Sequence, residues 1–104
     1  MKKGQRFDYI IETHIGLLYT GITNNMYRRF QEHLGPKKNG KGAKFFHFDR
    51  PKKVVYLEKV ENRSHAARKE ALIKKMTKIK KKDLIKNFSL RSEEIIREAG
   101  LDSL

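Results

Sequence analysis

The chain is short and strongly basic. Its 104 residues include 25 lysines and arginines against 12 aspartates and glutamates, for a formal net charge of +13. This length suits one domain with a modest core, to which ten aromatic residues contribute. The absence of cysteine excludes a disulfide scaffold, a cysteine-based zinc site and a thiol nucleophile. No apolar run is long enough to cross a membrane and no signal peptide is recognisable, so we expect a cytoplasmic protein without a membrane partner.

The positive charge is concentrated in residues 1–88, which carry +15, whereas residues 89–104 carry −2. We therefore expect a basic domain over 1–88 and an acidic, helical extension over 89–104. So large an excess of positive charge favours a polyanionic partner, because binding releases the counterions of the polyanion. Nucleic acid is the obvious partner. The alternative is a basic surface that only keeps the chain soluble, or one that binds acidic lipid or protein.

In chain order, the first elements predict a β-hairpin. Residues 7–13 alternate in the manner of a half-buried strand, which places Tyr9 on one face and Asp8 on the other. A short connection leads to a second strand over residues 17–22. Gly21 would weaken an ordinary strand, so we expect another group to approach its backbone closely.

A helix follows the hairpin. Residues 23–25 are rich in side chains that cap helix N-termini, and they precede an apolar stripe at helical spacing. The stripe consists of Met26, Phe30 and Leu34, and it predicts a helix that ends near Leu34.

The rest of the chain predicts a basic, glycine-bearing loop over 37–44 and a third strand over 52–60. Further helices are expected over about 63–76, 78–86 and 90–99. The order ββαβααα predicts an α+β fold, in which one layer of helices flanks a small three-stranded antiparallel sheet.

Glu70 is the first residue with a candidate chemical role. On a helix it shares a face with Ala66, Ala67 and Ile73, so that a carboxylate lies within an apolar stripe. A buried carboxylate needs a positive partner, which is an arginine, a lysine or a metal ion. A salt bridge to a neighbouring basic residue explains it as well as a functional role does.

Four more residues are candidates for one site. Arg29 and His33 are about one turn apart on the first helix and can reach one point at the sheet edge. A guanidinium suits phosphate oxygens, whereas a histidine can move a proton or donate to phosphate. Tyr9 and Tyr19 lie on adjacent strands and can present their hydroxyl groups together. Taken singly, the first pair could be a solvated basic face and the second pair ordinary aromatics.

Together these residues match a known pattern. Tyr9, Tyr19 and Arg29 follow one another at ten-residue intervals and precede an isolated helical glutamate, Glu70. This order resembles the GIY-YIG nuclease superfamily, in particular its small, stand-alone, single-domain bacterial branch. It is similar also to the N-terminal nuclease domain of the excinuclease that makes incisions in nucleotide-excision repair. The resemblance covers roughly residues 7–86 and includes segments 18–25, 28–33, 40–44, 53–56 and 62–75 in the family's order.

The chain departs from the family pattern at several positions. Phe7 and Asp8 stand where the family often has glycine and isoleucine, but Tyr9, which carries the hydroxyl group, is kept. Ile22 lies where some relatives place a lysine that would lower the pKa of the second tyrosine. The acidic tail has no counterpart that we can assign. Asn87 is a candidate for the asparagine that some relatives carry late in the domain.

The resemblance implies a division of roles. Glu70 would be the main protein ligand of one divalent metal ion, Mg²⁺ or Mn²⁺, which stabilises the leaving 3′ oxygen. Arg29 would hold the scissile phosphate. Tyr9, supported by Tyr19, would orient or deprotonate the attacking water. As a base it requires a nearby positive charge, because the pKa of tyrosine is ordinarily about 10.

The positive groups available for that purpose are Arg29, His33 and Lys44. Arg28, Lys41 and Lys44 are expected to bind the nucleic-acid backbone. The ordinary alternatives are a solvated loop lysine at position 44 and a histidine at position 33 that only caps or packs.

Two functions follow as expectations. The first is a metal-dependent endonuclease that hydrolyses phosphodiester bonds in DNA, in preference to RNA, in repair or recombination. The alternative is a non-catalytic nucleic-acid-binding module that keeps the nuclease fold. The intact set of catalytic residues favours the enzyme, whereas the missing lysine near Tyr19 favours the binding module. Because a chain this short has no separate targeting domain, we expect no strong sequence specificity unless a protein partner supplies it.

Overall fold

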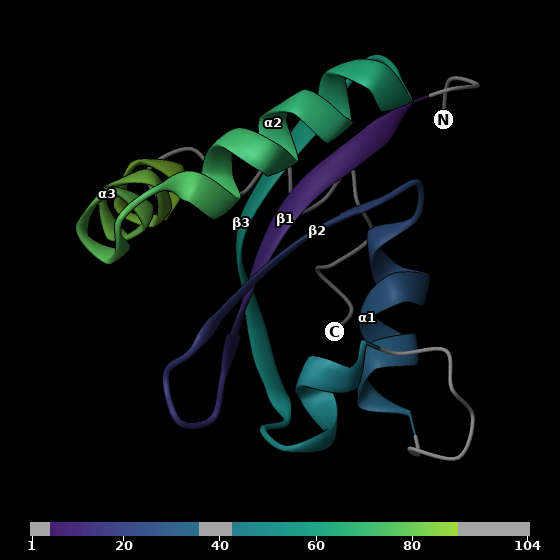
Figure 1. The fold of residues 1–104 in the computed structure, drawn as a ribbon. Helices are drawn as coiled ribbons and strands as arrows, with labels where there is room; N and C mark the ends of the chain where they lie inside the picture. Colours follow the sequence, from purple (N-terminus) through teal and green to yellow (C-terminus); the bar gives the residue numbers. More distant parts are fainter. Residues whose placement is uncertain (1–4, 36–42, 90–104) are drawn as a thin grey trace.

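The computed structural model describes residues 5–35 and 43–89, the coloured part of the ribbon in Figure 1. The expected helix over 90–99, and Lys41 with most of the basic loop, lie outside the described residues. Within the described ranges, no helix combines the length and the apolar character needed to cross a membrane.

Three antiparallel strands form the sheet in the spatial order β2-β1-β3, so that β1 is central and β2 is an edge strand. β1 and β2 make the predicted hairpin. Its turn contains Gly16 with a φ of 92°, a left-handed conformation that glycine adopts without strain. The strands are β1 (Arg6–Thr13), β2 (Leu18–Thr23) and β3 (Pro51–Val60).

Helices complete the described chain. Asparagine side chains begin two of them, because Asn25 accepts a hydrogen bond from the N–H of Arg28 and Asn62 accepts one from the N–H of His65. The predicted order of strands and α-helices is confirmed as far as residue 89, whereas the short 3₁₀ helix η2 was not predicted. The helices are α1 (Met26–Leu34), η2 (Lys44–His47), α2 (Arg63–Lys75) and α3 (Lys78–Ser89).

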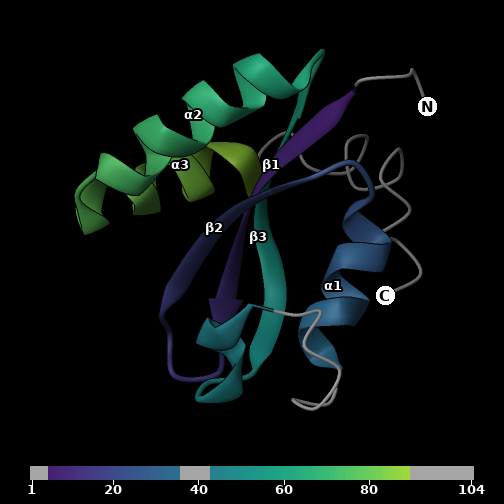
Figure 2. The ribbon, with the colours of Figure 1, turned by 45° about the vertical axis from the view of Figure 1, so that its right-hand side comes forward.

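The helices lie on both faces of the sheet, and not in the single layer expected from the sequence. α2 and α3 pack on one side of the strands and α1 lies on the other side (Figures 1 and 2). Residues 7–11 of β1 are therefore at most 1% exposed, and the expectation of a half-buried strand was wrong. The polar Asp8 between apolar neighbours made a strand buried on both faces look one-sided in the sequence.

The register of the sheet assigns residues to the two faces. Tyr9 pairs with Gly21 on β2 and with Leu57 on β3, whereas Asp8 pairs with Glu58 on β3. Directly paired residues share a face and consecutive residues alternate. Tyr9 therefore faces α1 and Asp8 faces α2. That the two residues lie on opposite faces is what the alternation in the sequence predicts.

Candidate active site

The phenol ring of Tyr9 lies across the backbone of Gly21, its partner on the edge strand. A Cβ atom at Gly21 would collide with the hydroxyl oxygen of Tyr9 and with the ring carbon that bears it. The ring therefore depends on the missing side chain at position 21 to pass over β2 toward α1. This is the close approach that a glycine in the middle of a strand indicates.

The hydroxyl group of Tyr9 lies 2.8 Å from Nε2 of His33 on α1. The other ring nitrogen of His33, Nδ1, accepts a hydrogen bond from the backbone N–H of Ala43 at 3.2 Å. A neutral imidazole carries one proton, so an accepting Nδ1 leaves that proton on Nε2. His33 therefore donates its Nε2–H to the oxygen of Tyr9.

Burial keeps both groups neutral. Tyr9 is 1% exposed and His33 is 2% exposed. Burial lowers the pKa of His33 to about 4, and the positive charge of Arg29 adds to this effect. Burial also raises the pKa of Tyr9 above its usual value, helped by Tyr19 and opposed by a hydrogen bond from Arg29. Of the positive groups expected near Tyr9, Arg29 is present, but His33 is uncharged at neutral pH.

Arg29 approaches the same hydroxyl group from α1. Its guanidinium is hydrogen-bonded to Tyr9 and forms an ion pair with Glu32, with 2.9 Å between Nη1 of Arg29 and Oε1 of Glu32. The oxygen of Tyr9 thus accepts from both His33 and Arg29, which uses both lone pairs of a neutral phenol. Donors to this oxygen favour the phenolate, but burial outweighs them, so the pKa of Tyr9 stays above its usual value and the phenol keeps its proton.

Tyr19 lies beside Tyr9 in an aromatic cluster. Its ring centroid is 6.2 Å from that of Tyr9, 5.5 Å from that of His33 and 4.9 Å from that of Phe46. Tyr19 is only half-buried, and within the described residues its hydroxyl group has no hydrogen-bond partner. The two tyrosines are therefore brought together as predicted, and Tyr19 is the more accessible of the two.

Glu70 lies on α2, which packs on the other face of the sheet from α1 (Figure 1). Its carboxylate pairs with Lys74 at 3.5 Å, and its side chain is 24% exposed. Of the apolar stripe expected around Glu70, Ala66 and Ile73 are buried as predicted, but Ala67 is exposed and Glu70 itself is only partly buried. Its charge nevertheless helps to raise the pKa of Tyr9, so the carboxylate lies within electrostatic range of that hydroxyl group.

The described residues fit a divalent ion held by few protein ligands. In the described ranges, no three histidines, aspartates or glutamates are grouped so that they could hold a metal. Mg²⁺ is commonly bound through one or two carboxylates together with water and phosphate. The partly exposed carboxylate of Glu70, paired with a lysine that is itself 57% exposed, fits such an open site.

Asp8 places a second carboxyl group on the α2 face of the sheet. It is fully buried, and neither of its oxygens has a hydrogen-bond partner within the part of the chain that the structure describes. Burial raises the pKa of Asp8 to about 7, the charges of Glu58 and Glu70 add to the rise, and Lys69 opposes it. The carboxyl group of Asp8 therefore keeps its proton to a much higher pH than an ordinary aspartate does.

The expected nucleic-acid contacts lie at the surface. Arg28 is exposed, donates to Asn24 at 2.8 Å and pairs with Glu32 at 3.8 Å. Lys44 is exposed at the first position of η2. Lys41 lies outside the described residues. The part of these residues in binding stays a prediction.

The site adjoins a groove of about 330 Å³. The groove lies where the end of β2 meets α1, with the first residues of β1 and α2 completing its walls. Its charged lining residues are Arg6, Arg28, Arg29, Glu32 and Arg63.

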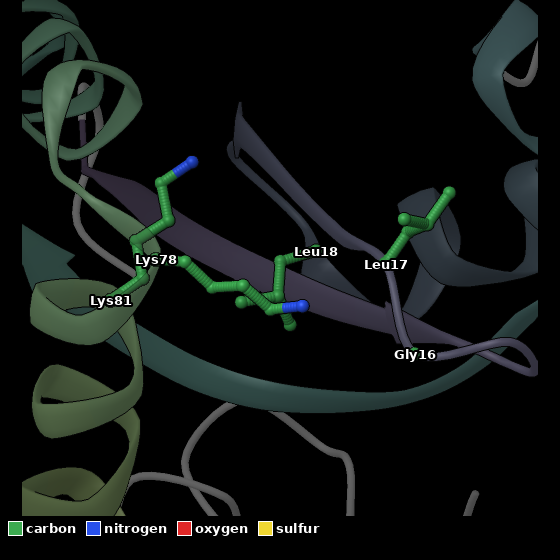
Figure 3. A pocket seen from close by; sticks show the side chains of 5 residues that line it. All are labelled: Gly16, Leu17, Leu18, Lys78 and Lys81. Carbon is green, nitrogen blue, oxygen red and sulfur yellow. The ribbon is translucent and has the colours of Figure 1, made fainter.

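A second hollow, of about 210 Å³, lies between the β1–β2 turn and α3. Figure 3 shows lysine side chains extending from α3 toward the hairpin, with the side chain of Leu17 turned away from them. None of the candidate catalytic residues lines this hollow. Its lining consists of Gly16, Leu17, Leu18, Lys78 and Lys81.

Sequence reasoning missed three parts of the site. Glu32 could have been found, because it follows Arg28 and Arg29 at the spacing that brings helical side chains together. Phe46 lies just past the segment predicted as a basic loop, where no periodic pattern marked it. The hydrogen bond from the backbone N–H of Ala43 could not be predicted, because almost any amino acid at this position supplies the same donor.

Comparisons with known protein families, proteins and structures agree on one family for this chain. The family profile described as the GIY-YIG catalytic domain matches residues 7–83. A UPF0213 protein of Clostridium perfringens is 39% identical over 93 residues, which are 89% of this chain and 96% of that protein. A UPF0213 protein of Syntrophus aciditrophicus is 43% identical over 82 residues, or 79% of this chain and 91% of that protein. The resemblance to small bacterial proteins is thus confirmed.

A solved structure supports the fold as well. The solution NMR structure of a UPF0213 protein from Bacillus halodurans matches with a TM-score of 0.50 and 30% identity. The match covers 79% of this chain and 83% of that one. The α+β architecture with a three-stranded antiparallel sheet is therefore shared with this relative.

Gly21→Ala is expected to separate Tyr9 from His33, because the added methyl group occupies the position of the phenol. We expect the fold to persist with a stability loss of about 1–3 kcal/mol. The ¹⁵N NMR signal of Nε2 in His33 should move as it does in Tyr9→Phe, the matched variant that removes only the acceptor oxygen. A His33 signal identical to that of the wild type would contradict the close approach.

Asp8→Asn is expected to stabilise the chain at high pH only. Folded Asp8 keeps its proton up to about pH 7, whereas an unfolded aspartate loses it near pH 4, so the stability of the wild type falls as the pH rises through this window. The advantage of the variant in free energy of unfolding should grow by roughly 2–3 kcal/mol between pH 5 and pH 8. Urea denaturation at the two pH values measures it, and a difference independent of pH would contradict the burial of an unpaired carboxyl group.

Proposed function

This chain belongs to the GIY-YIG catalytic domain family, and from that membership we propose that it is a metal-dependent endonuclease that hydrolyses phosphodiester bonds in DNA. We propose further that it acts in DNA repair or recombination. The basic charge of the chain supports a nucleic-acid substrate.

One observation carries the proposal. Tyr9, Tyr19, Arg29 and His33 come from three separate elements and meet in one cluster, with the carboxylate of Glu70 in electrostatic range. A phosphate diester needs an anion-binding group, a group that orients water and a place for a metal ion. The cluster contains a candidate for the first two, and Glu70, on α2 and within electrostatic range of Tyr9, is the candidate for the metal ligand.

We assign Arg29 to the scissile phosphate. Its guanidinium is fixed on one side by Tyr9 and on the other by Glu32. A group held in this way needs little rearrangement to stabilise negative charge as it develops on the phosphate. A phosphate oxygen that binds Arg29 would share or replace the contact with Glu32.

We assign the attacking water to Tyr19 and a positioning role to Tyr9. The sequence favoured the reverse division, with Tyr9 as the base. The burial of Tyr9 and its raised pKa keep the phenol protonated, which leaves it poorly suited to accept a proton. Tyr19 is half-buried with an unpaired hydroxyl group within the described chain, so water from the solvent can reach it.

Glu70 would hold the divalent ion, Mg²⁺ or Mn²⁺. Such an ion, when bound, supplies charge stabilisation to the leaving oxygen. The chain itself keeps the Glu70 carboxylate partly open to solvent, where substrate and water can complete the coordination.

Glu70→Gln is expected to reduce metal-dependent cleavage at least about 100-fold, because it removes the carboxylate charge that we assign to the ion. Glu61→Gln is the matched control, since Glu61 is exposed just before α2 and should leave the rate unchanged. A panel of duplex, branched and single-stranded DNA and of RNA, assayed with Mg²⁺ or Mn²⁺ and with chelator, measures both the activity and the substrate. Binding without cleavage by the wild type would favour the non-catalytic module. Cleavage that persists in excess chelator would contradict the metal site.

Tyr19→Phe and Tyr9→Phe separate the two tyrosines. Tyr19→Phe should lower the single-turnover rate about 100-fold or more while the dissociation constant for DNA stays within about twofold. Tyr9→Phe should lower the single-turnover rate and also weaken DNA binding, because Arg29 loses a hydrogen-bond partner. The reverse pattern would return the role of base to Tyr9.

A further inference from the structure

Among the described residues, the positively charged side chains that line the groove beside Arg29 are all arginines. Arg6 comes from the start of β1, Arg28 and Arg29 from α1, and Arg63 from the start of α2. The chain has 8 arginines and 17 lysines, so half of its arginines meet here, whereas no lysine is among the described residues of the lining. Because lysine would supply the same charge, the groove points to a ligand that needs the guanidinium group itself.

We propose that this groove is a second phosphate subsite, which binds the backbone phosphate next to the scissile one in a nucleic-acid strand. The proposal rests on the proposed function and adds a binding position to it. A planar guanidinium donates two parallel hydrogen bonds to phosphate oxygens and is less strongly hydrated than an ammonium group. Arginine is therefore the residue expected where a phosphate is held in a fixed orientation.

The arginines of the groove differ in their present partners. Arg28 and Arg29 pair with Glu32 at 3.8 and 2.9 Å. Arg6 donates to the carbonyl oxygen of its neighbour Gln5 at 3.0 Å, which leaves its charge uncompensated there. Arg63 is exposed and has no ion-pair or hydrogen-bond partner within the described ranges. Among the residues of 5–35 and 43–89, the wall formed by Arg6 and Arg63 therefore presents two guanidinium groups without a carboxylate partner.

The position of Arg29 relates the subsite to the reaction. Its guanidinium is bonded to the hydroxyl group of Tyr9 and also lines the groove. A strand that places one phosphate at Arg29 beside the tyrosines would extend its next phosphate toward Arg6 and Arg63. The volume of about 330 Å³ lies within the range of small-ligand sites, about 300–1,000 Å³.

Arg63→Ala tests the subsite against Arg68→Ala as a matched control. Both arginines are exposed on α2 and lack partners in the described part of the chain, but Arg68 does not line the groove. Fluorescence anisotropy with a labelled oligonucleotide in EDTA measures binding without cleavage. We expect Arg63→Ala to raise the dissociation constant about five- to tenfold and to reduce the salt slope by about 0.7–0.9, and Arg68→Ala to change the constant less than about twofold.

The outcomes separate the two proposals. Equal weakening by both variants, or no weakening by Arg63→Ala, would overturn the subsite while leaving the nuclease proposal in place. Failure of the wild type to bind any oligonucleotide would overturn both. Circular dichroism and melting temperatures show whether the variants are folded, which is expected because both positions are exposed.

A neutral linkage locates the subsite along the strand. A single methylphosphonate is moved one position at a time through the oligonucleotide. We expect one position, adjacent to the cleaved bond, where neutralisation weakens the wild type about five- to tenfold and leaves Arg63→Ala unaffected. If no position shows this coupling to Arg63, the proposal fails.

Discussion

The hydrogen bond from His33 to Tyr9 joins α1 to the central strand of the sheet, and the rest of the site is arranged around it. It exists because Gly21 lets the phenol pass over the edge strand, because burial keeps the imidazole neutral, and because the N–H of Ala43 leaves the proton on Nε2. Arg29 then adds the second donor to the same oxygen. Each of these conditions comes from a different part of the chain, so the site forms only when the whole sheet and α1 are in place.

Much of the fold could be predicted, because its signals are local. Alternation marked the hairpin, and asparagines marked the starts of α1 and α2. The sequence could not predict that helices cover both faces of the sheet. This depends on the side of the sheet to which α1 packs and the side to which α2 and α3 pack, which no local pattern fixes. Asp8 made β1 look exposed on one face, because a charged residue inside a strand normally indicates a side that faces solvent. η2 is one turn long, too short for any periodic signal.

The sequence could predict which residues form the site, but not how each of them is protonated and hydrogen-bonded. Spacing and family resemblance selected Tyr9, Tyr19, Arg29 and His33, and the structure brings these side chains together. The difference between the two tyrosines depends on burial and on the tautomer of His33, both of which are properties of the folded chain. Glu70 was expected to be buried, but its exposure is set by the orientation of α2, which helical periodicity does not fix.

The contact between Ala43 and His33 has a consequence for how such sites are recognised. The donor is a main-chain amide, so every amino acid except proline supplies it equally well. Related chains can therefore keep the same imidazole tautomer while the amino acid at position 43 varies. A search that compares residue identities alone would regard that position as unconstrained, although the protonation pattern of the whole centre depends on it.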